Sequence, residues 1–130
     1  MEQIRIEIVD ELMYARIPFW SIADNKYRNA FMLIDTGANV TSIAARALQK
    51  LGCYSETEKS TARTVGGSVD IYKVQIPKMM IGSLVLTDVA VHSHENLNEF
   101  PFDGIIGMNV LRQFNFSVNF DDNILSLEKR

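Results

Sequence analysis

The sequence lacks several features that would place the protein in a common functional class. Its only cysteine is Cys53, so no disulfide can form within the chain and the fold does not depend on an oxidising compartment. Lys and Arg number 13 against 16 Asp and Glu, a formal net charge of −3. Because no block of basic residues is present, the sequence argues against nucleic-acid binding and against electrostatic attachment to a membrane.

Long hydrophobic runs are also absent. The longest run of large apolar residues, 31–34, is far shorter than a membrane span. Charged residues interrupt the first seven positions, so the N-terminus lacks the apolar core of a signal peptide. We therefore expect a cytoplasmic protein with no membrane partner.

The pattern that is present predicts a single, mostly antiparallel all-β domain over residues 1–130. Apolar residues make up 47% and charged residues 22%, as in globular proteins, and a chain of this length can bury a core. Alternation of apolar and polar residues, with turn residues between the segments, predicts many short strands. These are expected over 4–8, 13–21, 27–34, 61–65, 69–76, 79–81, 84–92, 105–106, 116–120 and 124–127.

Three local features refine this prediction. Pro18 indicates that part of the second strand lies at a sheet edge. A short helix is expected over 43–51, with Thr41 or Ser42 as its N-cap and Gly52 as its C-terminal stop. One or two further helical turns are expected over 108–114.

The most informative motif is Asp35-Thr36-Gly37, which directly follows the apolar run 31–34. By itself the tripeptide is weak evidence, because Asp and Gly are ordinary turn residues. Its context is more specific. A Thr-Ser pair and a helix follow it, then a Gly-Gly hairpin dipeptide, and finally Asp-Gly-Ile-Ile-Gly-Met-Asn-Val-Leu at 103–111. In this order, from about residue 27 to residue 127, the chain resembles the retropepsin-like aspartic proteases, and in particular their bacterial and cellular branch.

The resemblance implies a closed acid-protease barrel with one or two short helices, and an aspartic endopeptidase that acts on peptide or protein substrates. The chain carries a single Asp-Thr-Gly motif, so the resemblance also implies a homodimer, in which Asp35 and its twin meet at a two-fold axis. Aspartic proteases are the standard example of two close carboxylates that share one proton. Such a pair activates a water molecule and needs neither metal nor cofactor.

The resemblance assigns roles to the residues of the Asp35 loop. Thr36 is expected to hydrogen-bond across the dimer and keep the two loops rigid. Gly37 lets the backbone approach the substrate, and its carbonyl accepts a substrate amide. Ala38 keeps the wall of the cleft thin, and Asn39 can hydrogen-bond a peptide backbone.

Two further segments are assigned in the same way. The hairpin at 65–69 matches the family's flap, which closes over the peptide, and we expect Gly66 and Gly67 to supply the positive φ angles of its turn. With these glycines, Val65 and Ser68 are expected to contact the substrate. The apolar strand that packs behind the active-site loop is expected to consist of Ile105, Ile106 and Gly107.

The chain departs from the retroviral pattern at three places. Asn39 stands where retroviral enzymes usually have an acidic residue, and Met108 stands where they usually have the arginine that pairs with it. The charged C-terminal residues 126–130 occupy a segment that is apolar and interleaved in retroviral dimers, so the dimer could use other strands. These departures leave a second hypothesis open: a catalytically weak dimerisation or peptide-binding module with the same fold.

Other candidate sites carry weaker signals. His92 and His94 share a strand face, but two histidines are fewer than the three or four ligands of a metal site, so no metal is predicted. Cys53 follows a helix end and has no motif around it, which favours a semi-buried thiol over a nucleophile.

Overall fold

Most of the chain forms β-strands. The computed structural model describes residues 1–130, apart from the side chain of Thr64. The strands are β1 (Glu2–Val9), β2 (Leu12–Ser21), β3 (Lys26–Ile34), β4 (Ser42–Ile43), β5 (Lys59–Thr64), β6 (Gly67–Ile81), β7 (Leu84–Ser93), β8 (Gly104–Ile106), β9 (Phe114–Asn119) and β10 (Ile124–Lys129). The helices are α1 (Ala45–Leu51), the 3-10 helix η1 (Glu95–Glu99) and α2 (Met108–Leu111).

The strands form one hydrogen-bonded sheet whose middle closes into a ring. The strand order is β5-β6-β7-β4-β8-β3-β2-β1-β10-β9, and an additional pair joins β6 to β2 through Met79 and Phe19. That pair closes the ring β2-β6-β7-β4-β8-β3. Only the β3–β8 and β4–β7 pairs are parallel, so the prediction of a mostly antiparallel all-β fold is confirmed.

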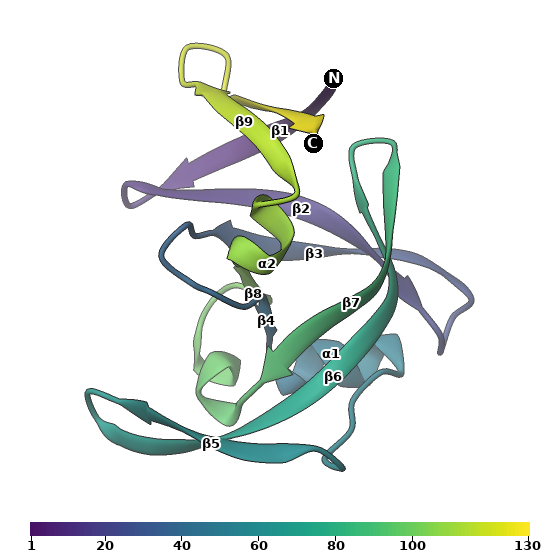
Figure 1. Cartoon of the computed structure of the whole chain (residues 1–130), viewed down its shortest axis with the longest axis vertical. Helices are drawn as coiled ribbons and strands as arrows, with labels where there is room; N and C mark the ends of the chain where they lie inside the picture. Colours follow the sequence, from purple (N-terminus) through teal and green to yellow (C-terminus); the bar gives the residue numbers. More distant parts are fainter.

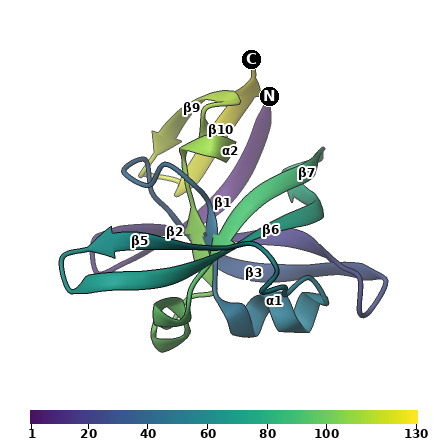
Figure 2. The ribbon, with the colours of Figure 1, turned by 60° about the horizontal axis from the view of Figure 1, so that its bottom comes forward.

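Both ends of the chain belong to the same part of the sheet. Residues 2–5 of β1 pair with β10, and residues 6–9 pair with β2. The N- and C-termini therefore lie beside each other at the top of Figure 1, and Figure 2 shows the same arrangement. β1, β10 and β9 form an arm of the sheet that extends from the ring, and β9 is the outer edge of this arm.

Apolar side chains from almost every element fill the core. Burying one Ile, Leu or Phe side chain stabilises the folded state by about 1.5–3 kcal/mol, so a core of this size can hold the short strands together. The largest side chains that are fully buried are Ile6, Ile17, Phe19, Met32, Ile43, Leu48, Ile76, Met79, Leu97, Ile106, Leu111 and Leu125.

The expected strand edge at Pro18 is confirmed. β1 leaves β2 at Ala15, and β6 reaches β2 only at Phe19. Between these points β2 pairs only with β3, on its other side. Pro18, which has no N–H to donate, therefore lies where one side of the strand has no ladder partner.

Several predicted boundaries differ from the observed ones, and two of the differences change the number or the order of elements. The strands expected over 69–76 and 79–81 are one strand, β6, because the ladder passes Pro77 without a break: the register continues from Ile76–Val89 to Lys78–Thr87. The helix expected from residue 43 begins at Ala45, because Ser42 and Ile43 instead pair with β8 as the short strand β4.

The structure contradicts the predicted N-cap of α1 and agrees with its predicted C-terminal stop. Its N-cap is Ala44, with no side-chain hydrogen bond, so the predicted cap by Thr41 or Ser42 was also wrong. Gly52 does stop the helix, in the left-handed conformation. None of the described helices is long and apolar enough to cross a membrane.

Candidate active site

β3 carries Asp35 to the surface at the end of a buried strand. β3 lies between β2 and β8 in the sheet. Ile34, its last residue, is buried, and Asp35 follows as a half-buried residue. The Asp35 backbone N–H donates to the carbonyl of Ile106 on β8 over 3.0 Å. The carboxylate therefore starts from a backbone position that two neighbouring strands fix.

The loop after Asp35 turns back on its carboxylate. The Gly37 N–H donates to Asp35 Oδ1 over 2.8 Å, and the Ala38 N–H donates to the Asp35 carbonyl. A Cβ atom on Gly37 would lie 3.1 Å from Asp35 Oδ1, closer than most real Cβ contacts, so a larger residue here would press on the carboxylate. Thr36, Gly37 and Asn39 are exposed, whereas Ala38 is half-buried. The loop thus combines one oriented carboxylate with neighbouring residues that are exposed to solvent.

The segment from Ile106 to Asn109 holds the loop from behind. The Met108 N–H donates to the Ala38 carbonyl over 2.8 Å, and the Asn109 N–H donates to the Asn39 carbonyl over 3.1 Å. Ile106 is fully buried next to this segment. Ile105, at the centre of β8, pairs with Leu33 and Ser42. The predicted support strand of Ile105, Ile106 and Gly107 is displaced by one residue, because β8 is Gly104–Ile106 and Gly107 follows it as the N-cap of α2.

Gly107 allows this close contact. A Cβ atom at Gly107 would lie 2.7–2.9 Å from the carbonyl atoms of Val40 and Ala38, closer than real Cβ contacts occur. Backbone atoms of the loop and of the support segment thus touch directly. Any larger residue would push the Asp35 loop outward.

Sequence reasoning missed the residues that close the loop at its far end. Thr41 is fully buried, and its backbone N–H and its hydroxyl both donate to Asn109 Oδ1 over 2.8 Å. The same hydroxyl accepts a hydrogen bond from the Gly107 N–H over 3.1 Å. Thr41 was predicted to cap a helix, and Asn109 was only part of a matched motif. The single signal that was available is the Asn directly after Gly-Met in 107–109.

The hairpin at 65–69 has a different turn from the predicted one. Val65 and Gly66 form the turn, and Gly67 already pairs with β5. Gly67 has a positive φ of 123°, as predicted for this glycine. Val65 is fully exposed at the tip. In Figures 1 and 2 this tip and the Asp35 loop extend toward the same side of the molecule.

Asp103, the other acidic residue in the matched motifs, is fully engaged elsewhere. One carboxylate oxygen accepts the Phe31 N–H over 2.8 Å, and the other forms an ion pair with Arg46 over 2.7 Å. Phe31 is four residues before Asp35, so Asp103 lies about 13 Å along the strand from the candidate site. Asp103 therefore links β3 to α1 and cannot act with Asp35 in the same chain.

The two histidines do not lie on one strand, as was predicted: His92 lies on β7, whereas His94 is the N-cap of η1. Burial lowers the pKa of His92, and Lys73 nearby lowers it further; burial also lowers the pKa of His94, with a smaller effect from His92. Nδ1 of His94 is buried without a hydrogen-bond partner. Among the described residues, no group of three His, Cys, Asp or Glu side chains could hold a metal ion. Cys53 is buried, which raises the pKa of its thiol and argues against a nucleophile.

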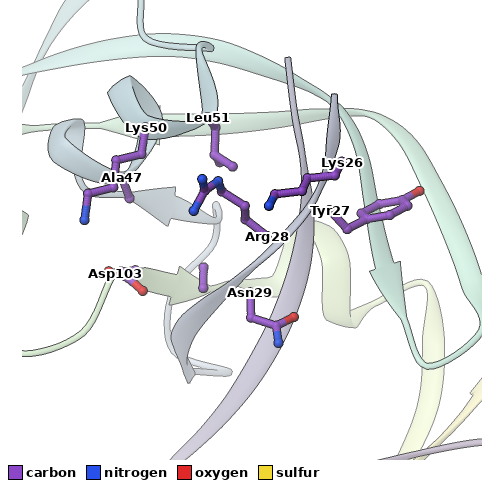
Figure 3. Close-up of a pocket in the computed structure, with 9 residues that line it drawn as sticks. Lys26, Tyr27, Arg28, Asn29, Ala47, Lys50, Leu51 and Asp103 are labelled. Carbon is purple, nitrogen blue, oxygen red and sulfur yellow. The ribbon is translucent and has the colours of Figure 1, made fainter. Parts of the chain in front are cut away.

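A separate hollow of about 380 Å³ lies at the opposite end of β3, between that strand and α1. Figure 3 shows the side chains of Lys26 and Arg28 directed into it from β3, and Lys50 beside it on α1. Arg28 is paired with Asp24, and Lys50 lies in the last turn of α1, where a cation complements the helix dipole. Arg28 thus has a structural partner, and the hollow does not include Asp35.

Comparison with known proteins identifies the fold from the structure and the family from the sequence. The structure is similar to a retropepsin-like aspartic protease from Rickettsia conorii, with a TM-score of 0.69, 20% identity, and coverage of 96% of this chain and 98% of that one. It is also similar to the EIAV protease in complex with the inhibitor HBY-793 (TM-score 0.59, 13% identity, 80% of this chain and 88% of that one). The retroviral protease-like domain of Ddi1 from Leishmania major gives a TM-score of 0.59 at 15% identity, with 98% and 88% coverage.

The sequence comparison is more specific than these structural likenesses, which at such low identity show the fold alone. No curated protein matches the sequence. Residues 22–113, however, match the family described as "gag-polyprotein putative aspartyl protease". That segment is more than half of the chain and runs from the turn before β3 to the residue before β9, so it includes the Asp35 loop and its support. The protein therefore belongs to this aspartyl protease family, and its fold is that of the retropepsin-like aspartic proteases.

Proposed function

We propose that this protein is an aspartic endopeptidase in which Asp35 and the same residue of a second copy form the acid–base pair. The observation that carries the proposal is the way in which the loop presents its carboxylate. Gly37 and Ile106 orient Asp35 from both sides, while the loop surface around it stays exposed. A general base needs this combination of fixed direction and access.

The need for a second copy follows from charge and geometry within one chain. The reaction requires one ionised and one protonated carboxyl group, and Asp103 is committed to Arg46 and Phe31. One chain therefore supplies half of the pair. A two-fold axis next to Asp35 would supply the other half and would bring the exposed Thr36 close to its twin.

The second copy would approach by a different surface from the interleaved termini of retroviral dimers. β1 and β10 already pair with each other within the chain. Neither terminal strand is thus available for exchange, and the arm has its outer edge at β9. We infer that the dimer is formed around the Asp35 loops without swapping of the terminal strands.

In the proposed mechanism, the ionised Asp35 removes a proton from a water molecule held between the two carboxyl groups. The water attacks the scissile carbonyl, and the protonated partner carboxyl donates a hydrogen bond to the developing oxyanion. A proton then passes to the leaving amine. The exposed backbone of Gly37 and Asn39 binds the peptide, and the hairpin at 65–68 closes over it. Because the pair needs one bound proton, the activity profile is bell-shaped and shifted to acid pH.

Substitution of Asp35 tests the catalytic assignment. Asp35→Asn should abolish hydrolysis of an unfolded protein substrate while the far-UV circular dichroism spectrum stays unchanged. Asp121→Asn is the matched control, because Asp121 is exposed in the β9–β10 turn and far from the loop in sequence and in the sheet. Substantial activity of Asp35→Asn would refute the assignment.

Subunit mixing tests the shared site. An excess of Asp35→Asn protein should draw wild-type chains into mixed dimers that have only one Asp35 carboxylate, so the activity per wild-type chain should fall. Dilution of the wild-type protein alone should also lower its specific activity, because monomers form. Sedimentation over the same dilution series measures the dimer directly. Full activity of a monomer would contradict the proposal, and a dimer that binds peptide without cleaving it would identify the protein as a binding module.

A further inference from the structure

The hollow between β3 and α1 is bordered by a strand edge without a neighbouring strand. β8 pairs with β3 only from Met32 to Ile34. Just before β8, the Asp103 carboxylate accepts the N–H of Phe31, and the Asp103 N–H donates to the Phe31 carbonyl. Among the described residues, 26–30 of β3 then pair with β2 alone. This free edge continues the line of β8 into the hollow.

The backbone groups of every second residue at this edge point away from β2. Opposite residues of an antiparallel pair alternate between bonding to each other and bonding outward, and Phe31 bonds outward to Asp103. Asn29 and Tyr27 therefore direct their N–H and carbonyl groups outward as well. Pro18 lies opposite Asn29 and has no N–H to give, which agrees with this alternation. No described residue bonds to these outward groups of Tyr27 and Asn29.

The side chains around this edge are mainly positively charged. Lys26 and Arg28 point into the hollow and Lys50 lies beside it (Figure 3). Arg28 shares its charge with Asp24, and Asp103, the acidic residue that lines the hollow, already has an arginine partner. Neither lysine forms an ion pair with any described residue. In a chain with a net charge of −3, the hollow is thus a locally positive site.

We propose that this edge binds an acidic peptide segment in extended conformation, which adds a strand to β3 beside Lys26, Arg28 and Lys50. Free backbone groups of a strand edge can pair with a further strand of almost any sequence, and the charges next to them select which strands approach. Here the cations repel basic segments and attract acidic ones. A small anion would leave the outward backbone groups of Tyr27 and Asn29 unused, so the observations favour a peptide.

The register of the edge also predicts the spacing of the acidic residues. Lys26 and Arg28 are two residues apart and share the face of β3 that carries the buried Ala30. Residues directly opposite each other on neighbouring strands lie on the same face of the sheet. The acidic side chains that meet Lys26 and Arg28 must therefore also be two residues apart. A peptide in which glutamate alternates with valine fits, whereas a block of consecutive glutamates directs half of its carboxylates to the other face.

This inference does not rest on the proposed protease function. Arg28 is seven residues before Asp35 on the same strand, so the hollow lies about 23 Å from the candidate active site. In the proposed enzyme, the edge would hold an acidic segment of a substrate outside the cleft. Binding itself needs no hydrolysis, so it can be measured with wild-type protein and with the Asp35→Asn variant, and we expect equal affinities.

Fluorescence anisotropy with short labelled peptides tests the charge requirement. The alternating peptide should bind at least tenfold more tightly than a block peptide of the same composition or a peptide with lysine in place of glutamate. Lys26→Glu and Lys50→Glu should each weaken binding about three- to tenfold, because an attraction becomes a repulsion. Lys129→Glu is the matched control: it changes the net charge equally, but on β10, and should leave the affinity unchanged.

A substitution at Asn29 tests the strand pairing separately from charge. Asn29→Pro removes an N–H that points away from β2, so the β2–β3 ladder keeps its bonds, whereas Asn29→Ala retains the N–H. The proline should weaken binding by about two- to tenfold, the effect of one backbone hydrogen bond, and the alanine should not. Methylation of the peptide nitrogens that face β3 should weaken binding in the same way and requires no change in the protein.

Several results would overturn the inference: equal affinities of Lys26→Glu and Lys129→Glu, equal affinities for the alternating and block peptides, or no effect of either Asn29→Pro or peptide methylation. Displacement of the peptide by an equal concentration of inorganic phosphate would identify a site for small anions and would also overturn it. If the wild-type protein hydrolyses no substrate, the proposed function fails, but the peptide affinities still decide whether the edge of β3 is a binding site.

Discussion

Gly107→Ala is expected to damage the candidate site by steric contact alone. The added Cβ would lie 2.7 Å from the carbonyl carbon of Val40, 2.8 Å from its oxygen and 2.9 Å from the oxygen of Ala38. Ordinary contacts begin near 3.4 Å, so the loop must move outward by about 0.7 Å (3.4 − 2.7) or the support segment must move back. All three atoms are backbone atoms, which cannot be relieved by a side-chain rotation.

The cost divides between stability and activity. Overpacking of a well-filled core typically costs about 1–3 kcal/mol of unfolding free energy, and we expect a loss in this range. The displaced atoms belong to the same short loop as Asp35, so kcat per folded dimer should also fall, by about tenfold or more.

Gly52→Ala is the matched control for this experiment. Gly52 has a φ of +74° at the end of α1, so alanine there costs a similar amount, about 1–2 kcal/mol, through backbone strain. Gly52 packs near Ala23 and makes no contact with the Asp35 loop. Urea denaturation measures both stabilities, and a peptide-cleavage assay on folded protein measures kcat. Equal kcat in the two variants, or a Gly107→Ala protein as stable as wild type, would refute the packing argument.

Three further predictions follow from other parts of the structure. Asp103→Asn should lower the unfolding free energy by about 1–3 kcal/mol, because it breaks the part-buried ion pair with Arg46. It should leave the kcat of the folded protein unchanged. A loss of activity without a loss of stability would instead place Asp103 in the active site. Burial lowers the pKa of His92 and His94 below their ordinary 6.5, so the unfolded state binds more protons just below pH 6.5, and stability should fall as the pH drops through that value. The fall should be smaller in a His92→Gln, His94→Gln variant, as measured by denaturation at pH 7.5 and 5.5; equal falls would assign it to other groups. Finally, chelators should leave proteolysis unchanged, and a loss that zinc restores would show that a metal takes part.

The local pattern of the sequence was sufficient for most strands and for the loop. Period-two alternation located β1, the turn residues at 10–11 and 24–26 bounded β2 and β3, and Asp121 to Asn123 marked the last hairpin. Asp35 was found because a carboxylate that follows an apolar strand and precedes Gly37 is a local feature. These predictions needed no information about distant partners.

The interactions that position the loop could not be predicted in this way. Thr41 and Asn109 are 68 residues apart, and Phe31 and Asp103 are 72 apart. Thr41 has good capping chemistry, so local reasoning placed its hydroxyl on the nearest helix, whereas the fold places it against Gly107. The pairing of Phe19 with Met79, which closes the ring, could not be predicted from the sequence either, because both residues have the character of ordinary apolar strand residues.

The hydrogen bonds between Thr41 and Asn109 join neutral groups, which has a consequence for the proposed activity at acid pH. A charge pair beside the site would weaken as its carboxylate bound a proton, in the same range in which the catalytic pair needs its own proton. The bonds that hold the Asp35 loop come from backbone amides and from the amide of Asn109, which do not titrate in that range. The loop geometry is thereby separated from the protonation of the proposed catalytic carboxylates. The replacement of both charged residues by Asn39 and Met108 is then consistent with the proposed activity, because the bonds that hold the loop do not depend on a carboxylate.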